Sequence, residues 1–143
     1  MYHITTAVHQ VKEATDKKVR TPSEVKDLFP QVGYLSQESF NIATLNAKNN
    51  VIDTHLITLG VVDASLVHPR EVFKAAIMDS ACAIVLVHNH PSGDPTPSAE
   101  DLRLTKLLVQ AGKIMDIRIL DHIIIAHDKT LSIREEGLVD FSC

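Results

Sequence analysis

The sequence predicts an α/β domain in which helices and strands alternate along one compact chain. Segments with the spacing of amphipathic helices alternate with short apolar runs. One of these runs, residues 83–87 (AIVLV), is continuously apolar and partly β-branched, as expected for a strand buried on both faces of a sheet. A chain of 143 residues lies in the usual size range of a single domain and can bury a real core. We expect residues 21–143 to form this domain and residues 1–20 to form an N-terminal arm or an added strand.

The first helix is predicted from its start signals. Thr21 suits the N-cap, Pro22 suits the first helical position, and Glu24 can close a capping box. Pro30 should end the helical run.

The remaining elements follow from apolar spacing and turn residues. Two strand-like segments flank an Asn-rich turn, which is typical of a hairpin. The expected elements are strands at 40–45 and 51–60 around a turn at 48–50, a helix at 68–79, the strand at 83–87, a helix at 98–111 that stops at Gly112, and strands at 117–126 and 131–133.

Composition excludes several classes of protein. The chain is 45% hydrophobic and 22% charged, as in soluble globular proteins, and it has no apolar stretch near the roughly 20 residues needed to span a bilayer. Residues 1–17 lack the apolar region of a secretory signal. Cys82 and Cys143 are expected to be free thiols in a reducing, cytoplasmic environment. A net charge of −4 argues against a broad phosphate-binding surface.

Residues 88–101 contain the strongest functional pattern, His-x-His-x7-Ser-x2-Asp. His88 and His90 are two residues apart, so on an extended backbone they point to the same side. Asp101 falls in the first turn of the helix predicted next, where its carboxylate can point back toward them. A zinc ion with three protein ligands and one open position is the layout of a catalytic site. The pattern therefore predicts a metal-dependent hydrolase.

Each part of this pattern also has an ordinary structural explanation. Ser98 and Asp101 fit a helix capping box, and the two histidines could make ordinary hydrogen bonds at a strand end. The letters His-Asn-His do not reproduce the spread-out motif of a homing-type nuclease. Four other histidines have no partner at ligand spacing, so surface or turn positions are expected for them. These are His3, His9, His55 and His127.

Three blocks of the sequence resemble the RadC family. Residues 88–93, together with Ser98 and Asp101, resemble the JAMM (MPN-type) zinc metallopeptidase motif of that family, and residues 66–73 and 121–125 resemble two further blocks. The resemblance runs from about Glu38 to Gly137. It implies a single-domain MPN (JAB)-like fold, with a mixed sheet flanked by helices.

The resemblance also implies roles for individual residues. One Zn²⁺ would be held by His88, His90 and Asp101 and would lower the pKa of its bound water toward about 7. Glu38, just before a predicted strand, would act as the general base for attack on an amide carbonyl. Ser98 and the zinc would stabilise the oxyanion.

Two other positions in the family-like blocks have competing explanations. Glu71 is a rival to Glu38, but it follows Pro69 and suits a structural place in the first turn of a helix, favoured by the helix dipole. Asp121 and His122 could support the metal ligands from behind, and a packing role is the alternative.

Two classes of function remain open at this stage. The first is a zinc metallopeptidase acting on a protein or peptide substrate. The alternative is a non-catalytic accessory protein in DNA repair or recombination, as the family name suggests. Longer RadC proteins carry a helix-hairpin-helix module before this domain, and no such module is seen here. We therefore expect no DNA binding by this domain alone, and no membrane association.

Overall fold

The computed structural model describes residues 1–3 and 11–142, and within them it contains a five-stranded mixed sheet. The strand order is β2-β1-β3-β4-β5. The strands are β1 (Ser39–Leu45), β2 (Val51–Leu59), β3 (Ala83–Asn89), β4 (Arg118–Ala126) and β5 (Lys129–Ser132). β3 and β4 are parallel, while the other neighbouring strands are antiparallel. This arrangement confirms the predicted α/β fold with a mixed sheet.

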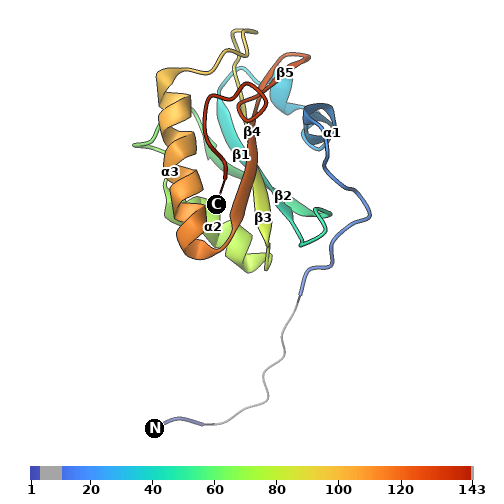
Figure 1. Cartoon of the computed structure of the whole chain (residues 1–143), viewed down its shortest axis with the longest axis vertical. Coiled ribbons are helices and arrows are strands. Elements are labelled where there is room, and N and C mark those ends of the chain that lie inside the picture. The colour runs from blue at the N-terminus through green and yellow to red at the C-terminus, as the bar shows by residue number, and fades with distance from the viewer. Residues whose placement is uncertain (4–10, 143) are drawn as a thin grey trace.

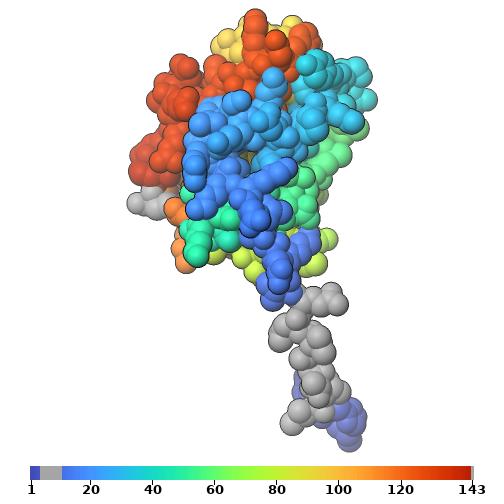
Figure 2. Space-filling view, turned by 90° about the vertical axis from the view of Figure 1, so that its right-hand side faces the viewer, coloured from blue at the N-terminus to red at the C-terminus, as the bar shows by residue number. Residues whose placement is uncertain are grey.

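Helices cover both faces of the sheet, as Figure 1 shows. α2 (Pro69–Met78) and α3 (Ala99–Met115) pack on one face. α1 (Pro22–Asp27) and the 3-10 turn η1 (Val32–Tyr34) pack on the other, and Figure 2 shows the segment leading into α1 at the surface on this side of the molecule. Every residue of β1 and β3 is buried as a result, which confirms the prediction of a fully buried strand at 83–87. Among the described residues, no helix is long and apolar enough to cross a membrane.

α1 begins as its sequence predicts but is shorter. The Thr21 hydroxyl accepts a hydrogen bond from the backbone N–H of Glu24 at 3.2 Å. The Glu24 carboxylate accepts from the backbone N–H of Arg20 at 2.7 Å, so the reciprocal bond forms one residue before the N-cap. The helix ends at Asp27, and Phe29 beyond it still packs against the sheet.

The predicted end of α3 at Gly112 is wrong. The helix continues to Met115, and the C-cap residue Asp116 that follows has a left-handed φ of 54°. Gly112 is buried inside the helix, where a Cβ atom would lie 2.5 Å from the carbonyl oxygen of Ile117. Glycine at this position therefore lets the chain that leads into β4 pass close to the helix, and it does not end the helix.

The N-terminal segment meets the sheet beside the β1–β2 hairpin. The backbone N–H of Thr15 donates to the carbonyl of Val51, and the N–H of Val51 donates to the carbonyl of Lys17. Lys18 and Asn50 form an isolated antiparallel bridge. Part of the expected arm thus pairs at the edge of the sheet, while its residues 4–10 lie outside the described residues.

Candidate metal centre

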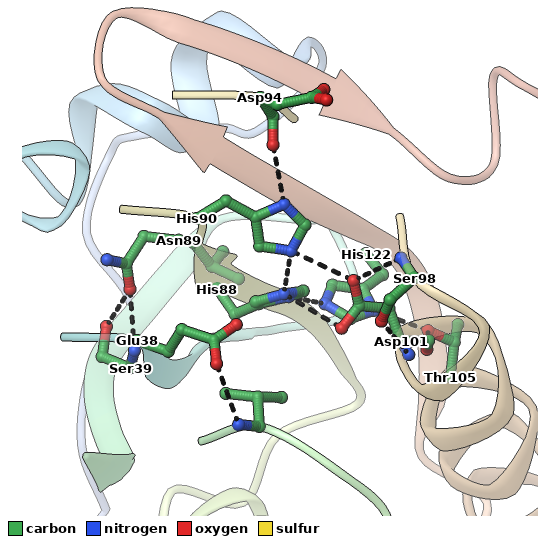
Figure 3. Close-up of polar contacts among 12 residues, drawn as sticks. Glu38, Ser39, His88, Asn89, His90, Asp94, Ser98, Asp101, Thr105 and His122 are labelled. Carbon is green, nitrogen blue, oxygen red and sulfur yellow. Dashed lines mark hydrogen bonds and ion pairs between the residues drawn. The ribbon is translucent and has the colours of Figure 1, made fainter. Parts of the chain in front are cut away.

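The three predicted ligands come together where the end of β3 meets the start of α3 (Figure 3). The Nε2 atoms of His88 and His90 lie 2.9 Å apart. Asp101 places Oδ1 3.2 Å from Nε2 of His88 and Oδ2 3.0 Å from Nε2 of His90. The side chains of His88 and Asp101 are almost fully buried, and that of His90 is 13% exposed. A strand end and a helix start therefore bring two nitrogens and a carboxylate to one point.

The capping-box explanation of Asp101 and the ligand explanation both fit the structure. The Ser98 hydroxyl accepts from the backbone N–H of Asp101 at 3.1 Å, and Oδ2 of Asp101 accepts from the N–H of Ser98 at 2.8 Å. The same carboxylate faces both imidazoles. Burial opposes ionisation of Asp101, but its contacts with the rings of His88 and His90 and the hydrogen bond from the Ser98 N–H outweigh it and hold the pKa of this carboxyl well below its usual range.

The loop between the histidines and α3 orients His90. Its Nδ1 lies 2.8 Å from the carbonyl oxygen of Asp94, which can only accept, so Nδ1 carries a proton and donates. Gly93 shapes the loop with a φ of +85°, and a Cβ atom there would lie 3.0 Å from the ring of His127. Pro91, Pro95 and Pro97 stiffen the same loop.

A chain of hydrogen bonds behind His88 fixes its tautomer. The hydroxyl of Thr105 donates its one proton to the carbonyl oxygen of Asp101 at 2.6 Å, so it can only accept from Nδ1 of His122, also at 2.6 Å. Burial lowers the pKa of His122 far below its usual range, so the ring is neutral and its Nε2 is an acceptor. That Nε2 lies 2.8 Å from Nδ1 of His88. His88 therefore carries its proton on Nδ1.

These tautomers make the cluster a site for a cation. In an uncharged ring a proton on Nδ1 leaves a lone pair on Nε2, and in both His88 and His90 this lone pair faces the other ring and Asp101. Burial disfavours the charged form of His90, but the hydrogen bond with Asp101 and that to the Asp94 carbonyl raise its pKa. Two lone pairs and a carboxylate this close need a proton or a metal ion between them. Two imidazoles and one carboxylate are a ligand set that zinc takes in catalytic sites, so the residues fit zinc.

Glu38 approaches the histidines from the β1 side, whereas Asp101 approaches from α3 (Figure 3). A carboxylate oxygen of Glu38 lies within 4.8 Å of ring nitrogens of His88 and His90. Its Oε2 accepts from the backbone N–H of Val62 at 3.4 Å. The rival Glu71 is exposed in the first turn of α2. The structure thus brings Glu38 to the histidine pair and places Glu71 on the surface.

Asn89 lies between the two histidines and was assigned no role from the sequence alone. Its Oδ1 accepts from the backbone N–H of Ser39 at 2.7 Å and from the Ser39 hydroxyl at 2.8 Å. Its Nδ2 donates to the carbonyl of Gln37 at 2.9 Å. Asn89 thus holds both chain neighbours of Glu38. Strand alternation is the signal that could have found it, because the residue between two inward-facing histidines must point to the other face.

Comparison with known proteins places this site in a family. A sequence model of the RadC-like JAB domain matches residues 19–138. The chain belongs to the RadC family. The UPF0758 protein TTE0897 of Caldanaerobacter subterraneus subsp. tengcongensis is 52% identical over 124 residues, which cover 86% of this chain and 53% of that protein. The UPF0758 protein lmo1549 of Listeria monocytogenes is 50% identical over 128 residues, or 89% of this chain and 57% of the relative.

This RadC-family chain spans about half the length of the curated relatives it matches. The names of the two relatives state no activity. The matched region contains every residue of the candidate metal centre, from Glu38 to His122.

Proposed function

We propose that this RadC-family chain is a zinc-dependent hydrolase of peptide or isopeptide bonds. The observation that carries the proposal is the convergence of the Nε2 atoms of His88 and His90 with the carboxylate of Asp101, all within 3.2 Å. The proton positions on the two rings support it, because both lone pairs face the same point. Glu38 supplies the further carboxylate that such a reaction needs.

Zinc, when bound by these three ligands, supplies an acidified water and polarises the carbonyl of the scissile bond. The Glu38 carboxylate accepts the proton of the attacking water and holds it on a carboxylate oxygen. It then passes that proton to the nitrogen of the leaving amine, so one carboxylate acts first as base and then as acid. The hydrogen bonds of Asn89 to the residues on either side keep the backbone of Glu38 in place during both transfers.

Ser98 has a hydroxyl proton available for catalysis. Its oxygen accepts from the N–H of Asp101, which leaves its own O–H free to donate. We assign this O–H to the oxyanion that forms as water adds to the carbonyl. Ser98 is exposed at the start of α3, where a substrate can reach it.

The test uses Glu38→Gln, which keeps the shape of the side chain but cannot take up the proton. Zinc content, measured by elemental mass spectrometry, should equal that of wild type. Hydrolysis of fluorogenic peptide and lysine ε-amide libraries should fall by about 10²–10⁴-fold. Glu71→Gln is the matched control and should retain full activity, since Glu71 lies on the surface.

Two results would contradict the proposal at different points. Full activity in Glu38→Gln would remove Glu38 from the role of base while leaving the metal site intact. Absence of zinc from the wild-type chain, even after reconstitution, would exclude the hydrolase altogether.

A further inference from the structure

A second group of metal-ligating side chains lies at the other end of the sheet. Asp53 and His55 on β2 and Asp79 at the C-cap of α2 each offer a donor atom, and these atoms all lie within 4.8 Å of one another. The hydroxyl of Thr44 on β1 donates a hydrogen bond to Asp79. Phe40, which pairs with His88, lies four residues earlier on the same strand, about 13 Å away along an extended backbone. The two groups therefore share no residue.

His55 departs from the expectation of a surface or turn position. Its side chain is 24% exposed, and its Nε2 lies 2.6 Å from Oδ2 of Asp79. The carboxylate oxygen is an acceptor, so Nε2 carries a proton in this arrangement. A proton thus occupies the side of the ring that faces the two carboxylates.

Asp79 is a buried carboxylate, and one of its two oxygens accepts no hydrogen bond. Its side chain is 1% exposed, and its Oδ2 accepts from the Thr44 hydroxyl at 2.7 Å as well as from His55. Its Oδ1 points into the group and has no hydrogen-bond partner among the described residues. A buried charge with an oxygen that accepts no hydrogen bond favours a cation beside it.

An ammonium group now stands where that cation would sit. Nζ of Lys12 lies 2.9 Å from Oδ1 of Asp79, without the alignment of a hydrogen bond, and 2.7 Å from Oδ2 of Asp53. The Lys12 side chain is 50% exposed and comes from the N-terminal segment rather than from the sheet. The Lys12–Asp53 pair is exposed on both sides and therefore weak, so a cation that binds Asp79 and Asp53 better than the ammonium does can replace it.

We propose that Asp53, His55 and Asp79 form a second divalent-metal site, which takes zinc or a similar transition metal and which Lys12 fills in the metal-free chain. One imidazole and two carboxylates are ligands that Zn²⁺, Co²⁺ and Mn²⁺ accept. Binding releases the Nε2 proton of His55 to solvent, while Nδ1 keeps or takes up a proton, so the ring that binds is neutral. The ammonium of Lys12 leaves with its proton, and the N-terminal segment before Thr15 loses this anchor.

The experiment is a zinc titration of the full chain by calorimetry. Wild type should bind two zinc ions per chain, one at each group, and His55→Ala should bind one. His3→Ala is the control for the loss of a histidine and should still bind two, because His3 is exposed and belongs to neither ligand group. Lys12→Ala should tighten the second site by at least about two- to fivefold, the range expected when the exposed pair with Asp53 alone no longer competes. Asp101→Ala should keep the zinc held by His55.

Three outcomes would overturn this site independently of the catalytic proposal. They are the absence of bound zinc in Asp101→Ala, two zinc ions in His55→Ala, or weaker second-site binding in Lys12→Ala. If His55→Ala fails to fold, the ring carbon resonance of His55 in the wild-type chain gives the answer. It should shift as zinc is added, and an unchanged resonance at saturating zinc would also exclude the site.

Discussion

Thr105→Val tests the hydrogen-bond chain that sets the tautomer of His88. Valine matches the shape of threonine but cannot accept from Nδ1 of His122, a residue with no solvent exposure. An unsatisfied buried N–H costs about 1–3 kcal/mol. The metal-free chain can avoid this cost by moving the His122 proton to Nε2. The proton of His88 must then move to its own Nε2, where it blocks the lone pair needed for metal.

Zinc binding to Thr105→Val has to return the protons of His88 and His122 to Nδ1. The free energy of the unsatisfied N–H of His122 then appears as a loss of zinc affinity. We expect the zinc dissociation constant of Thr105→Val to rise by about 10- to 100-fold, or roughly 1.4–2.7 kcal/mol. Competition against a chromophoric zinc chelator at fixed pH measures this directly. Thr105→Ser keeps the hydroxyl and should stay near wild type. Nitrogen NMR of the imidazoles should show Nδ1–H tautomers for His88 and His122 in wild type only.

A folded Thr105→Val that binds zinc within twofold of wild type would refute this role of Thr105. So would a wild-type His122 that carries its proton on Nε2, whatever the zinc affinity.

Three further changes test the fold and the metal centre. Gly33→Ala would place a Cβ atom 2.1 Å from the carbonyl oxygen of His127, and it should lower the free energy of unfolding by about 1–3 kcal/mol. Tyr34→Phe, at an exposed neighbour, should change it by less than about 0.5 kcal/mol in the same denaturant titration. Burial raises the pKa of Asp121 above 3.8, although a hydrogen bond from Ser132 partly offsets it, so the folded state holds this proton more tightly than the unfolded state. The stability that this proton adds is complete below pH 3.8 and is lost as pH rises through the folded pKa, so wild type should gain stability relative to Asp121→Asn on acidification. A chelator should lower the melting temperature of zinc-loaded wild type, because bound zinc stabilises the folded state. The melting temperature of Asp101→Ala should fall less. An equal fall would show that zinc stabilises the chain without the Asp101 carboxylate.

Local signals in the sequence were sufficient for the positions and types of the main elements. The start of α1 follows from the Thr21-Pro22 pair and the buried strand from its unbroken apolar run. The end of α3 was mispredicted because Gly112 is a common helix-stop signal. Its actual role depends on Ile117, which meets it only after the chain turns back. A contact of this kind forms only in the folded chain, so no local sequence pattern predicts it.

The same limit applies to the two metal-ligating groups. His88, His90 and Asp101 lie within one 14-residue stretch, so their spacing alone could bring them to notice. His122 was left without a definite role, since its partners are 34 and 17 residues away on β3 and α3. His55 was assigned to the surface because its partner Asp79 ends a helix 24 residues later.

The loop with three prolines between His90 and Ser98 has an entropic consequence for metal binding. Prolines restrict the unfolded chain, each by about 0.4–1 kcal/mol where the native backbone accepts them. The bonds of His90 to Asp94 and of Asp101 to Ser98 hold the two ends of this loop before any metal is bound. Little chain remains to be ordered when the ion arrives. Loosening the loop should therefore reduce the entropy of metal binding and leave its enthalpy nearly unchanged, since the ligands themselves stay the same.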